Sequence, residues 1–309
     1  MSEPAVPGAR CVPCVLDDLV GAIQALDLPP STAGQILDEA LAWLAREFPG
    51  RKSPSYYITG VHRILKRVAG LPVPFAELRA SCNRVGVEIA KRVRAEASPL
   101  SGYARFRHLA LWAIAGNELD FRTVGTGYGF DVGRIETRLR GIVEEGLSVD
   151  RLPEIHETFR AARRLLYIPD NVGEIAFDRL LVEEFRSWGL IVSVPYRGGP
   201  ITSDATLEDF QEVGLDRAAD RVFRAGPDTL GIQMEEMSDD LARAIQEHDH
   251  VLTKGQANYY LVLRDGPRLE ALVASLLTTK CDLVARTFGH DTDRIRVATL
   301  ADFRTRRAP

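Results

Sequence analysis

Apolar residues in the first half of the chain recur with the spacing of amphipathic helices. They fall at i, i+3, i+4 and i+7 over several stretches, with few β-branched runs between them. Pro49 and Gly50 end the first of these stretches, as expected at the end of a helix. The predicted helices cover residues 33–48, 57–69, 75–97, 102–115 and 132–145.

After about residue 160 the pattern changes, and short apolar strings alternate with helical stretches. The strings predict strands at residues 165–168, 190–194, 221–223, 250–252, 272–277 and 295–298. The helical stretches between them cover residues 174–188, 206–213, 239–248, 258–262 and 282–288. This alternation predicts βαβ units and a mostly parallel sheet covered on both faces. We therefore expect an α/β protein with a helical domain over residues 1–160 and a second domain over residues 161–309.

Composition narrows the class of protein. The net charge is -4, and basic residues are scattered among acidic ones, which argues against a nucleic-acid partner. No stretch approaches the ~20 apolar residues that cross a bilayer, and the first ten residues lack a secretory pattern. Four cysteines in 309 residues do not indicate a disulfide framework. We expect a cytoplasmic protein that binds neither nucleic acid nor membrane.

Acidic and amide side chains follow the first two predicted strands. Asp170 and Asn171 come directly after the first strand, with Glu174 close behind, and Asp204 lies in the loop after the second. Ligands of open parallel sheets bind beyond the carboxyl ends of the strands. Carboxylate and amide oxygens suit hard cations such as Mg²⁺ or Mn²⁺. Each segment alone is also typical of a turn or a helix cap, but two acidic loops on neighbouring strands favour a metal site.

Two glycine-containing segments have different value as candidate sites. Lys254 and Gly255 follow a predicted strand, where a lysine beside exposed backbone N–H groups suits a phosphate. A solvent-facing lysine is the simpler alternative, and the spacing of a Walker A loop is absent. Residues 125–129 contain three glycines but lie among predicted helices, so a flexible loop is a better interpretation than a dinucleotide-binding loop.

Cys11 and Cys14 have the spacing of half a zinc site or of a redox pair. A structural zinc needs four ligands, and Cys82 and Cys281 would have to supply the others from distant positions in the chain. The sequence leaves both interpretations of Cys11 and Cys14 open, a second metal site or a redox pair.

Six segments, in this order, resemble the damage-control phosphatases, metal-dependent phosphatases long known as a domain of unknown function, and in particular the small prokaryotic branch. They carry C-x-x-C, G-N-x-x-D-F and D-N-x-G-E motifs, an acidic loop, a K-G-x-x-N-Y motif and a K-C pair. The segments are residues 11–14, 116–121, 170–174, 200–209, 254–259 and 279–281. Each segment alone has little specificity, but together they span almost the whole chain.

The resemblance implies a helical domain packed on a three-layer α/β/α domain with a mostly parallel, Rossmann-like sheet. It implies hydrolysis of phosphate monoesters of sugars or related phosphometabolites with a divalent cation, Mn²⁺, Co²⁺, Ni²⁺ or Mg²⁺. The implied metal ligands are the residues that the strand ends already indicated, namely Asp170, Asn171 and Asp204. The implied phosphate- and substrate-binding residues are Lys254, Asn258, Asn117 and Asp120.

For the reaction we expect attack of water on phosphorus beside the cation. Asp170, Asp204 and Glu174 are the candidate catalytic residues, and either Asp204 or Glu174 would orient the water. A covalent phosphoaspartate is the open alternative. Two other classes of protein stay in view. An S-adenosylmethionine-dependent methyltransferase shares the doubly wound sheet but needs a glycine-rich loop after its first strand, and a non-catalytic phosphometabolite-binding protein would keep the acidic loops.

Overall fold

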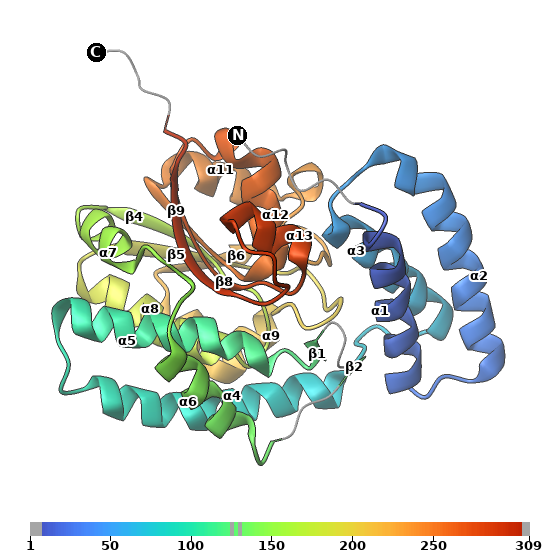
Figure 1. The fold of residues 1–309 in the computed structure, drawn as a ribbon, viewed down its shortest axis with the longest axis horizontal. Helices are drawn as coiled ribbons and strands as arrows, with labels where there is room; N and C mark the ends of the chain where they lie inside the picture. Colours follow the sequence, from blue (N-terminus) through green and yellow to red (C-terminus); the bar gives the residue numbers. More distant parts are fainter. Residues whose placement is uncertain (1–7, 124–126, 129–131, 305–309) are drawn as a thin grey trace.

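The computed structural model describes residues 8–123, 127–128 and 132–304. Within them the chain forms an α/β fold, with a group of three helices at one end (Figure 1). No helix in these ranges has the length and apolar content to cross a membrane. Of the predicted loop at residues 125–129, only residues 127 and 128 lie in the described part of the chain. They form β2 (Gly127–Tyr128), which pairs with β1 (Arg122–Thr123).

The three helices at one end pack against one another around their own apolar core. They are α1 (Cys11–Ala25), α2 (Pro30–Glu47) and α3 (Pro54–Ala69). Leu19, Ile36 and Tyr57 are fully buried in this core. The predicted helices 33–48 and 57–69 are confirmed as α2 and α3. The helix α1 is not among the predicted elements. Its buried residues Val15, Leu19 and Ala22 nevertheless have the spacing of an amphipathic helix.

The main sheet has seven strands in the order β3-β9-β8-β7-β4-β5-β6. The strands are β3 (Val149–Asp150), β4 (Arg164–Ile168), β5 (Ile191–Tyr196), β6 (Arg221–Arg224), β7 (His250–Lys254), β8 (Leu272–Thr278) and β9 (Arg296–Asp302). All neighbours are parallel except β8 and β9. The mostly parallel sheet and its six long strands are confirmed, whereas β3 is too short to give a periodic pattern.

The strand order reverses between β4 and β7. From β4 the chain continues to β5 and β6 on one side, then returns to add β7 and β8 on the other. Residues 165–168 of β4 pair with residues 250–253 of β7. Such a switch in direction leaves a crevice beyond the strand ends, where ligands bind in doubly wound sheets. Asp170 and Gly255 lie just beyond the ends of these two strands.

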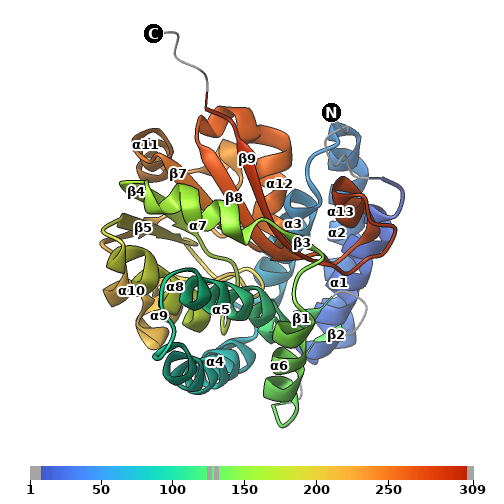
Figure 2. The ribbon, with the colours of Figure 1, turned by 60° about the vertical axis from the view of Figure 1, so that its left-hand side comes forward.

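Helices cover both faces of the sheet (Figure 2). On one face α4 (Ala76–Ala97), α5 (Gly102–Ala115) and α8 (Ile175–Ser187) pack together. On the other lie α11 (Asp239–Glu247) and α12 (Gly255–Asp265). The remaining helices are α6 (Ile135–Glu145), α7 (Leu152–Arg160), α9 (Leu207–Val213), α10 (Leu215–Ala218) and α13 (Asp282–Ala285). Short 3-10 turns complete the chain at residues 48–50, 116–119, 234–236, 266–269 and 286–288.

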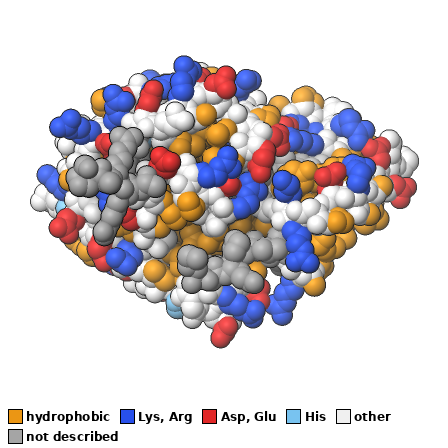
Figure 3. Space-filling view, turned by 90° about the horizontal axis from the view of Figure 1, so that it is seen from above, with side chains coloured by type: hydrophobic (Ala, Val, Ile, Leu, Met, Phe, Trp, Pro, Cys, Tyr) orange, Lys and Arg blue, Asp and Glu red, His pale blue; other side chains and the backbone are white. Residues whose placement is uncertain are grey.

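The predicted division near residue 160 does not coincide with a break in the apolar core. The helices α4 to α7 share one core with α8 and the sheet. The helices α1 to α3 supply most of another apolar cluster, which also includes buried residues from later in the chain, such as Cys82, Val172 and Leu230. The boundary at residue 160 stays a prediction about folding units. On the face in Figure 3, basic and acidic side chains are interspersed.

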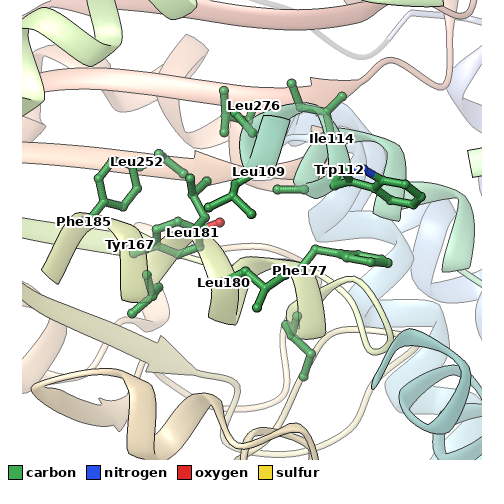
Figure 4. Close-up of a cluster of buried hydrophobic side chains, with 14 of the residues drawn as sticks. Leu109, Trp112, Ile114, Tyr167, Phe177, Leu180, Leu181, Phe185, Leu252 and Leu276 are labelled. Atoms are coloured by element: carbon green, nitrogen blue, oxygen red, sulfur yellow. The ribbon is translucent and has the colours of Figure 1, made fainter. Parts of the chain in front are cut away.

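Large side chains fill the layer between α5, α8 and the sheet (Figure 4). Phe185 of α8 is fully buried there. Its ring lies 5.2 Å from that of Trp188 and 5.8 Å from that of Phe159, between centroids. The contacts tie α8 to α7 as well as to the strands.

We expect Phe185→Ala to lower the free energy of unfolding by about 3–5 kcal/mol, because it opens a cavity in a packed core. Leu41→Ala is the control, since Leu41 is 49% exposed on α2. It should change stability by less than about 0.5 kcal/mol. Urea denaturation followed by near-ultraviolet circular dichroism measures both. Equal effects of the two substitutions would contradict this assignment of the core.

Candidate functional site

The turns after β4 and β7 meet at the switch in strand order, around the side chain of Asp170. Gly255 opens α12 directly after β7 and has a φ of +73°. A Cβ at this position would lie 1.8 Å from Asp170 Oδ2. Only glycine permits both the backbone angle and the close approach. The backbone of the β7 turn therefore lies directly against the carboxylate that follows β4.

Half of the Asp170 carboxylate is unpaired although the residue is buried, with 3% of its surface exposed. Oδ2 accepts a hydrogen bond from Asn171 Nδ2 at 2.8 Å. Oδ1 is buried and has no hydrogen-bond partner among the described residues. An acceptor left in this state costs free energy, so it calls for an explanation such as a bound ion.

Electrostatics at Asp170 also favour a cation. Burial raises the pKa of Asp170 well above its ordinary value, and the neighbouring Glu174 and Asp204 raise it further. Lys280 and Arg197 act in the opposite direction without cancelling the effect. Carboxylates gathered in a buried place repel one another unless a proton or a positive ion joins them.

Asp204 reaches this place from the long loop after β5. Its backbone forms an isolated bridge with Asn171, beside the end of β4. Arg197 Nε and the Gly231 N–H donate to Asp204 Oδ1 at 3.0 and 2.9 Å. Among the described residues, the one hydrogen-bond contact of Oδ2 is long, 3.5 Å from Thr202 Oγ1. The loop thus holds one oxygen of Asp204 firmly and leaves the other weakly used.

The amide of Asn171 is fixed between three side chains. Its Oδ1 accepts a hydrogen bond from Ser203 Oγ at 2.7 Å, and its Nδ2 donates to Asp170 and, at 3.3 Å, to Glu174. The three predicted metal ligands are therefore neighbours. Among the described residues, no group of three or more His, Cys, Asp or Glu side chains is arranged to bind a metal ion. A cation here would use two carboxylates, the Asn171 oxygen and ligands from outside the chain, a set that suits a hard divalent ion.

Lys254, predicted as a phosphate ligand, is buried away from the cavity and saturated. Its Nζ donates to the Ala113 carbonyl at 2.8 Å and to Glu174 Oε1 at 2.9 Å, and it lies 3.1 Å from Asp178 Oδ1. Burial lowers the pKa of Lys254, but the two carboxylates outweigh it and raise that pKa above its ordinary value. Burial acts in the opposite direction on a carboxyl group, and it raises the pKa of Asp178 to about 6. In this structure the ammonium neutralises buried carboxylates.

The other predicted polar residues support the turns. Glu174 is fully buried, and its Oε2 accepts a hydrogen bond from Asn117 Nδ2 at 2.8 Å. Asn258 is also fully buried; its Nδ2 donates to the Pro169 and Lys254 carbonyls at 3.0 and 2.8 Å. Asn258 thereby joins the end of β7 to the end of β4.

A cavity of about 100 Å³ opens beside Asp170, between α1, α3, α12 and the turn after β8. Asp120 and Asn171 line it, as predicted site residues, and so does Lys280. Lys280 forms an ion pair with Asp120. It was not among the predicted site residues, although it lies two residues after the end of β8 and belongs to the K-C pair at residues 279–281.

Arg197 is a second residue that the sequence analysis missed. It directly follows β5, is 2% exposed and joins Asp204 to Asn258, to whose Oδ1 its Nη2 donates at 3.0 Å. Its position after a strand was the only signal in the sequence. Cys11 and Cys14, for which the sequence left open a second metal site or a redox pair, also line the cavity.

The fold is that of a doubly wound α/β protein, and the candidate ligand site lies at the switch in strand order. A family model described as the damage-control phosphatase ARMT1-like domain matches residues 8–295. The chain belongs to this family, as the motifs predicted.

Individual relatives agree with this assignment. The chain is 32% identical to a damage-control phosphatase from Archaeoglobus fulgidus, over 90% of this chain and 94% of the relative. It is 27% identical to a damage-control phosphatase from Pyrococcus horikoshii, over 79% and 80% of the two chains. The crystal structure of a DUF89 family protein from Pyrococcus horikoshii superposes with a TM-score of 0.81 at 24% identity. That comparison covers 94% of this chain and 97% of the other, and it confirms the fold.

We expect Gly255→Ala to weaken binding of Mn²⁺ by about 10- to 100-fold, because the new methyl group displaces the Asp170 carboxylate. Gly289→Ala is the matched control: its φ is +80°, but nothing lies within 4 Å of an added Cβ. It carries the same backbone strain without the contact. Titration calorimetry measures the affinity, and unchanged binding in Gly255→Ala would remove Asp170 from the cation site.

We expect Lys254→Met to destabilise the fold by about 3–5 kcal/mol, because it leaves buried carboxylates without their counter-ion. Lys91→Met is the control, since Lys91 is 65% exposed and should not affect stability. Thermal and urea denaturation measure both variants. A Lys254→Met protein that folds with wild-type stability but has a raised KM for phosphate esters would instead make Lys254 a phosphate ligand.

Proposed function

We propose that this protein is a metal-dependent phosphatase that hydrolyses phosphate monoesters of small metabolites such as sugars. A divalent cation, Mn²⁺, Co²⁺, Ni²⁺ or Mg²⁺, is held by Asp170, Asn171 and Asp204. Membership of the damage-control phosphatase family supports the hydrolase class. The observation that carries the proposal is the buried, unpaired Oδ1 of Asp170 beside a cavity at the strand switch.

A divalent cation held by Asp170, Asn171 and Asp204 would supply charge neutralisation for the phosphoryl group and would make water a better nucleophile. The chain's own residues hold and orient the reactants. Asp170 lines the cavity and has an oxygen without a hydrogen-bond partner among the described residues, and the missing side chain at Gly255 leaves room for its carboxylate. Lys280 lines the same cavity and brings a positive charge to the place where the phosphate oxygens would lie.

Of the two carboxylates predicted to orient the water, Asp204 is better placed than Glu174. Both oxygens of Glu174 are occupied, one by Lys254 at 2.9 Å and the other by Asn117 at 2.8 Å. In the part of the chain that the structure describes, Asp204 Oδ2 has no hydrogen bond besides its long contact with Thr202. We therefore assign the water-orienting role to Asp204 and a positioning role to Glu174, which acts through Asn171 and Lys254.

The cavity suits a small substrate. Its volume of about 100 Å³ beside Asp170 admits a phosphoryl group with a short carbon skeleton. Its lining combines the Lys280–Asp120 ion pair with apolar side chains from α1 and α3, including Val15 and Ile58. Charged groups at one side and apolar groups at the other match a phosphate ester with a compact organic part.

We expect Asp170→Asn to lower hydrolysis of p-nitrophenyl phosphate by on the order of 10³-fold, because it removes a charged cation ligand. The assay uses chelator-stripped protein resupplied with Mn²⁺, Co²⁺, Ni²⁺ or Mg²⁺. Asp240→Asn is the control, since Asp240 is 43% exposed and pairs with Arg221 and Arg243 on the surface. Without cation, Asp170→Asn should melt no lower than wild type, because its buried charge is gone.

The same assay separates the two alternative functions. Activity that survives in Asp170→Asn would contradict the cation site. Cation binding without hydrolysis of p-nitrophenyl phosphate or any sugar phosphate would favour a phosphometabolite-binding protein. Tight binding of S-adenosylmethionine would favour a methyltransferase, although β4 is followed by Asp170 and Asn171 rather than by a glycine-rich loop.

A further inference from the structure

Three cysteines from distant parts of the sequence line the same cavity as Asp170. Cys11 and Cys14 lie in the first turn of α1, and Cys281 precedes α13, in the turn after β8. All three are partly exposed, whereas Cys82 is fully buried. Each of the four cysteines, all in the described part of the chain, is a thiol. The proposed phosphatase reaction uses none of them.

The segments that carry Cys11 and Cys281 are in direct contact. Arg10 Nη1 donates to Asp282 Oδ2 at 2.8 Å. This hydrogen bond joins the residue before Cys11 to the residue after Cys281. The pKa of Cys11 is raised, first by burial and then by the neighbouring Cys281 and Asp282. The Cys11 and Cys281 side chains are thus neighbours in the lining of the cavity.

The Tyr260 side chain lies beside the thiols of Cys11 and Cys281. Burial raises the pKa of Tyr260 well above its ordinary value, and Cys281 and Cys11 raise it further. Gln256 fixes the turn: its Nε2 donates to Cys281 Sγ at 3.6 Å, and its Oε1 accepts from the Lys280 N–H at 2.7 Å. Cys281 is therefore held in place on the turn that also carries Lys280 into the cavity.

We propose that Cys11 and Cys281 form a reversible disulfide bond in the lining of the cavity, which stops turnover at the Asp170 site. The effect on turnover rests on the proposed phosphatase function, whereas the bond itself does not. The bond ties α1 to the β8 turn. Since α1 packs on α3, whose Ser55 and Ile58 also line the cavity, the helical group can no longer move away to exchange substrate and product.

The oxidant is a low-molecular-weight disulfide such as oxidised glutathione. The thiolate of one cysteine attacks the oxidant, which forms a mixed disulfide and releases one glutathione thiol. The thiolate of the other cysteine then attacks the protein sulfur of that mixed disulfide and releases the second glutathione thiol. The two cysteines lose two electrons, the oxidant gains them, and the two cysteine protons end on the released thiols.

A metal ion is a less suitable partner for these thiols. Among the described residues no group of three or more His, Cys, Asp or Glu side chains is arranged to hold one. Cys14 lies one turn after Cys11 on α1, so it is the rival partner for Cys11 and must be tested.

The experiment treats the full-length, Mn²⁺-loaded protein with oxidised glutathione and maps its disulfides by mass spectrometry without reduction. We expect a linked pair of peptides containing Cys11 and Cys281, lighter by two hydrogen atoms than the reduced pair. Hydrolysis of p-nitrophenyl phosphate should fall by about tenfold or more and return after dithiothreitol. Cys11→Ser and Cys281→Ser should each keep their rate through the oxidant. Cys82→Ser, the buried control, should respond as wild type does.

Three results would overturn the proposal: a bond between Cys11 and Cys14, inhibition that persists in Cys281→Ser, or stoichiometric zinc that Cys281→Ser no longer holds. Peptide mapping does not depend on catalysis. If the reduced protein hydrolyses no phosphate ester, the proposed function fails, while the map still decides whether the bond forms. In that case Mn²⁺ calorimetry compares how fast the reduced and the oxidised protein bind the ion. Equal rates of binding would contradict closure of the cavity by the bond.

Discussion

A buried carboxylate at the point where the strand order reverses determines how the surrounding turns are built. Asp170 leaves β4 with one oxygen unpaired, and the backbone at Gly255 lies so close that no side chain fits there. Parallel strands direct their carboxyl ends to one edge, and the reversal opens a crevice at that edge. The fold therefore places a negative charge where water is scarce, and the rest of the site compensates for it.

The compensation is visible as a layered arrangement of charge. Lys254 neutralises Glu174 and Asp178 beneath the turn, and Arg197 pairs with Asp204 beside it. Asp170 Oδ1 and Asp178 Oδ2 both lack a hydrogen-bond partner among the described residues, but of these two residues Asp170 is the one that lines the cavity. The side chains around it are fixed by their own hydrogen bonds, so a ligand finds an organised place rather than inducing one.

The sequence predicted the long strands, most helices and the neighbouring positions of Asp170, Asn171 and Asp204, because each of these depends on local pattern and on the rule for strand ends. It did not reveal that Lys254 is buried, because that depends on Glu174 and Asp178, which reach it from another helix. The helix α1 was not predicted, since Cys11 and Cys14 in its first turn were interpreted only as a metal or redox pair. Burial and pairing are properties of the assembled layers, which no local window contains.

The antiparallel last strand has a consequence for how the protein is made. The strand β9 lies between β8 and β3, and among the described residues β3 pairs with β9 alone. While the chain is being synthesised, residues 149–150 have no strand to pair with, and one edge of β8 stays open, until residues 296–302 leave the ribosome. The edge of β8, next to the turn that carries Lys280 and Cys281, is thus closed later than the edges at which β4, β5 and β7 pair.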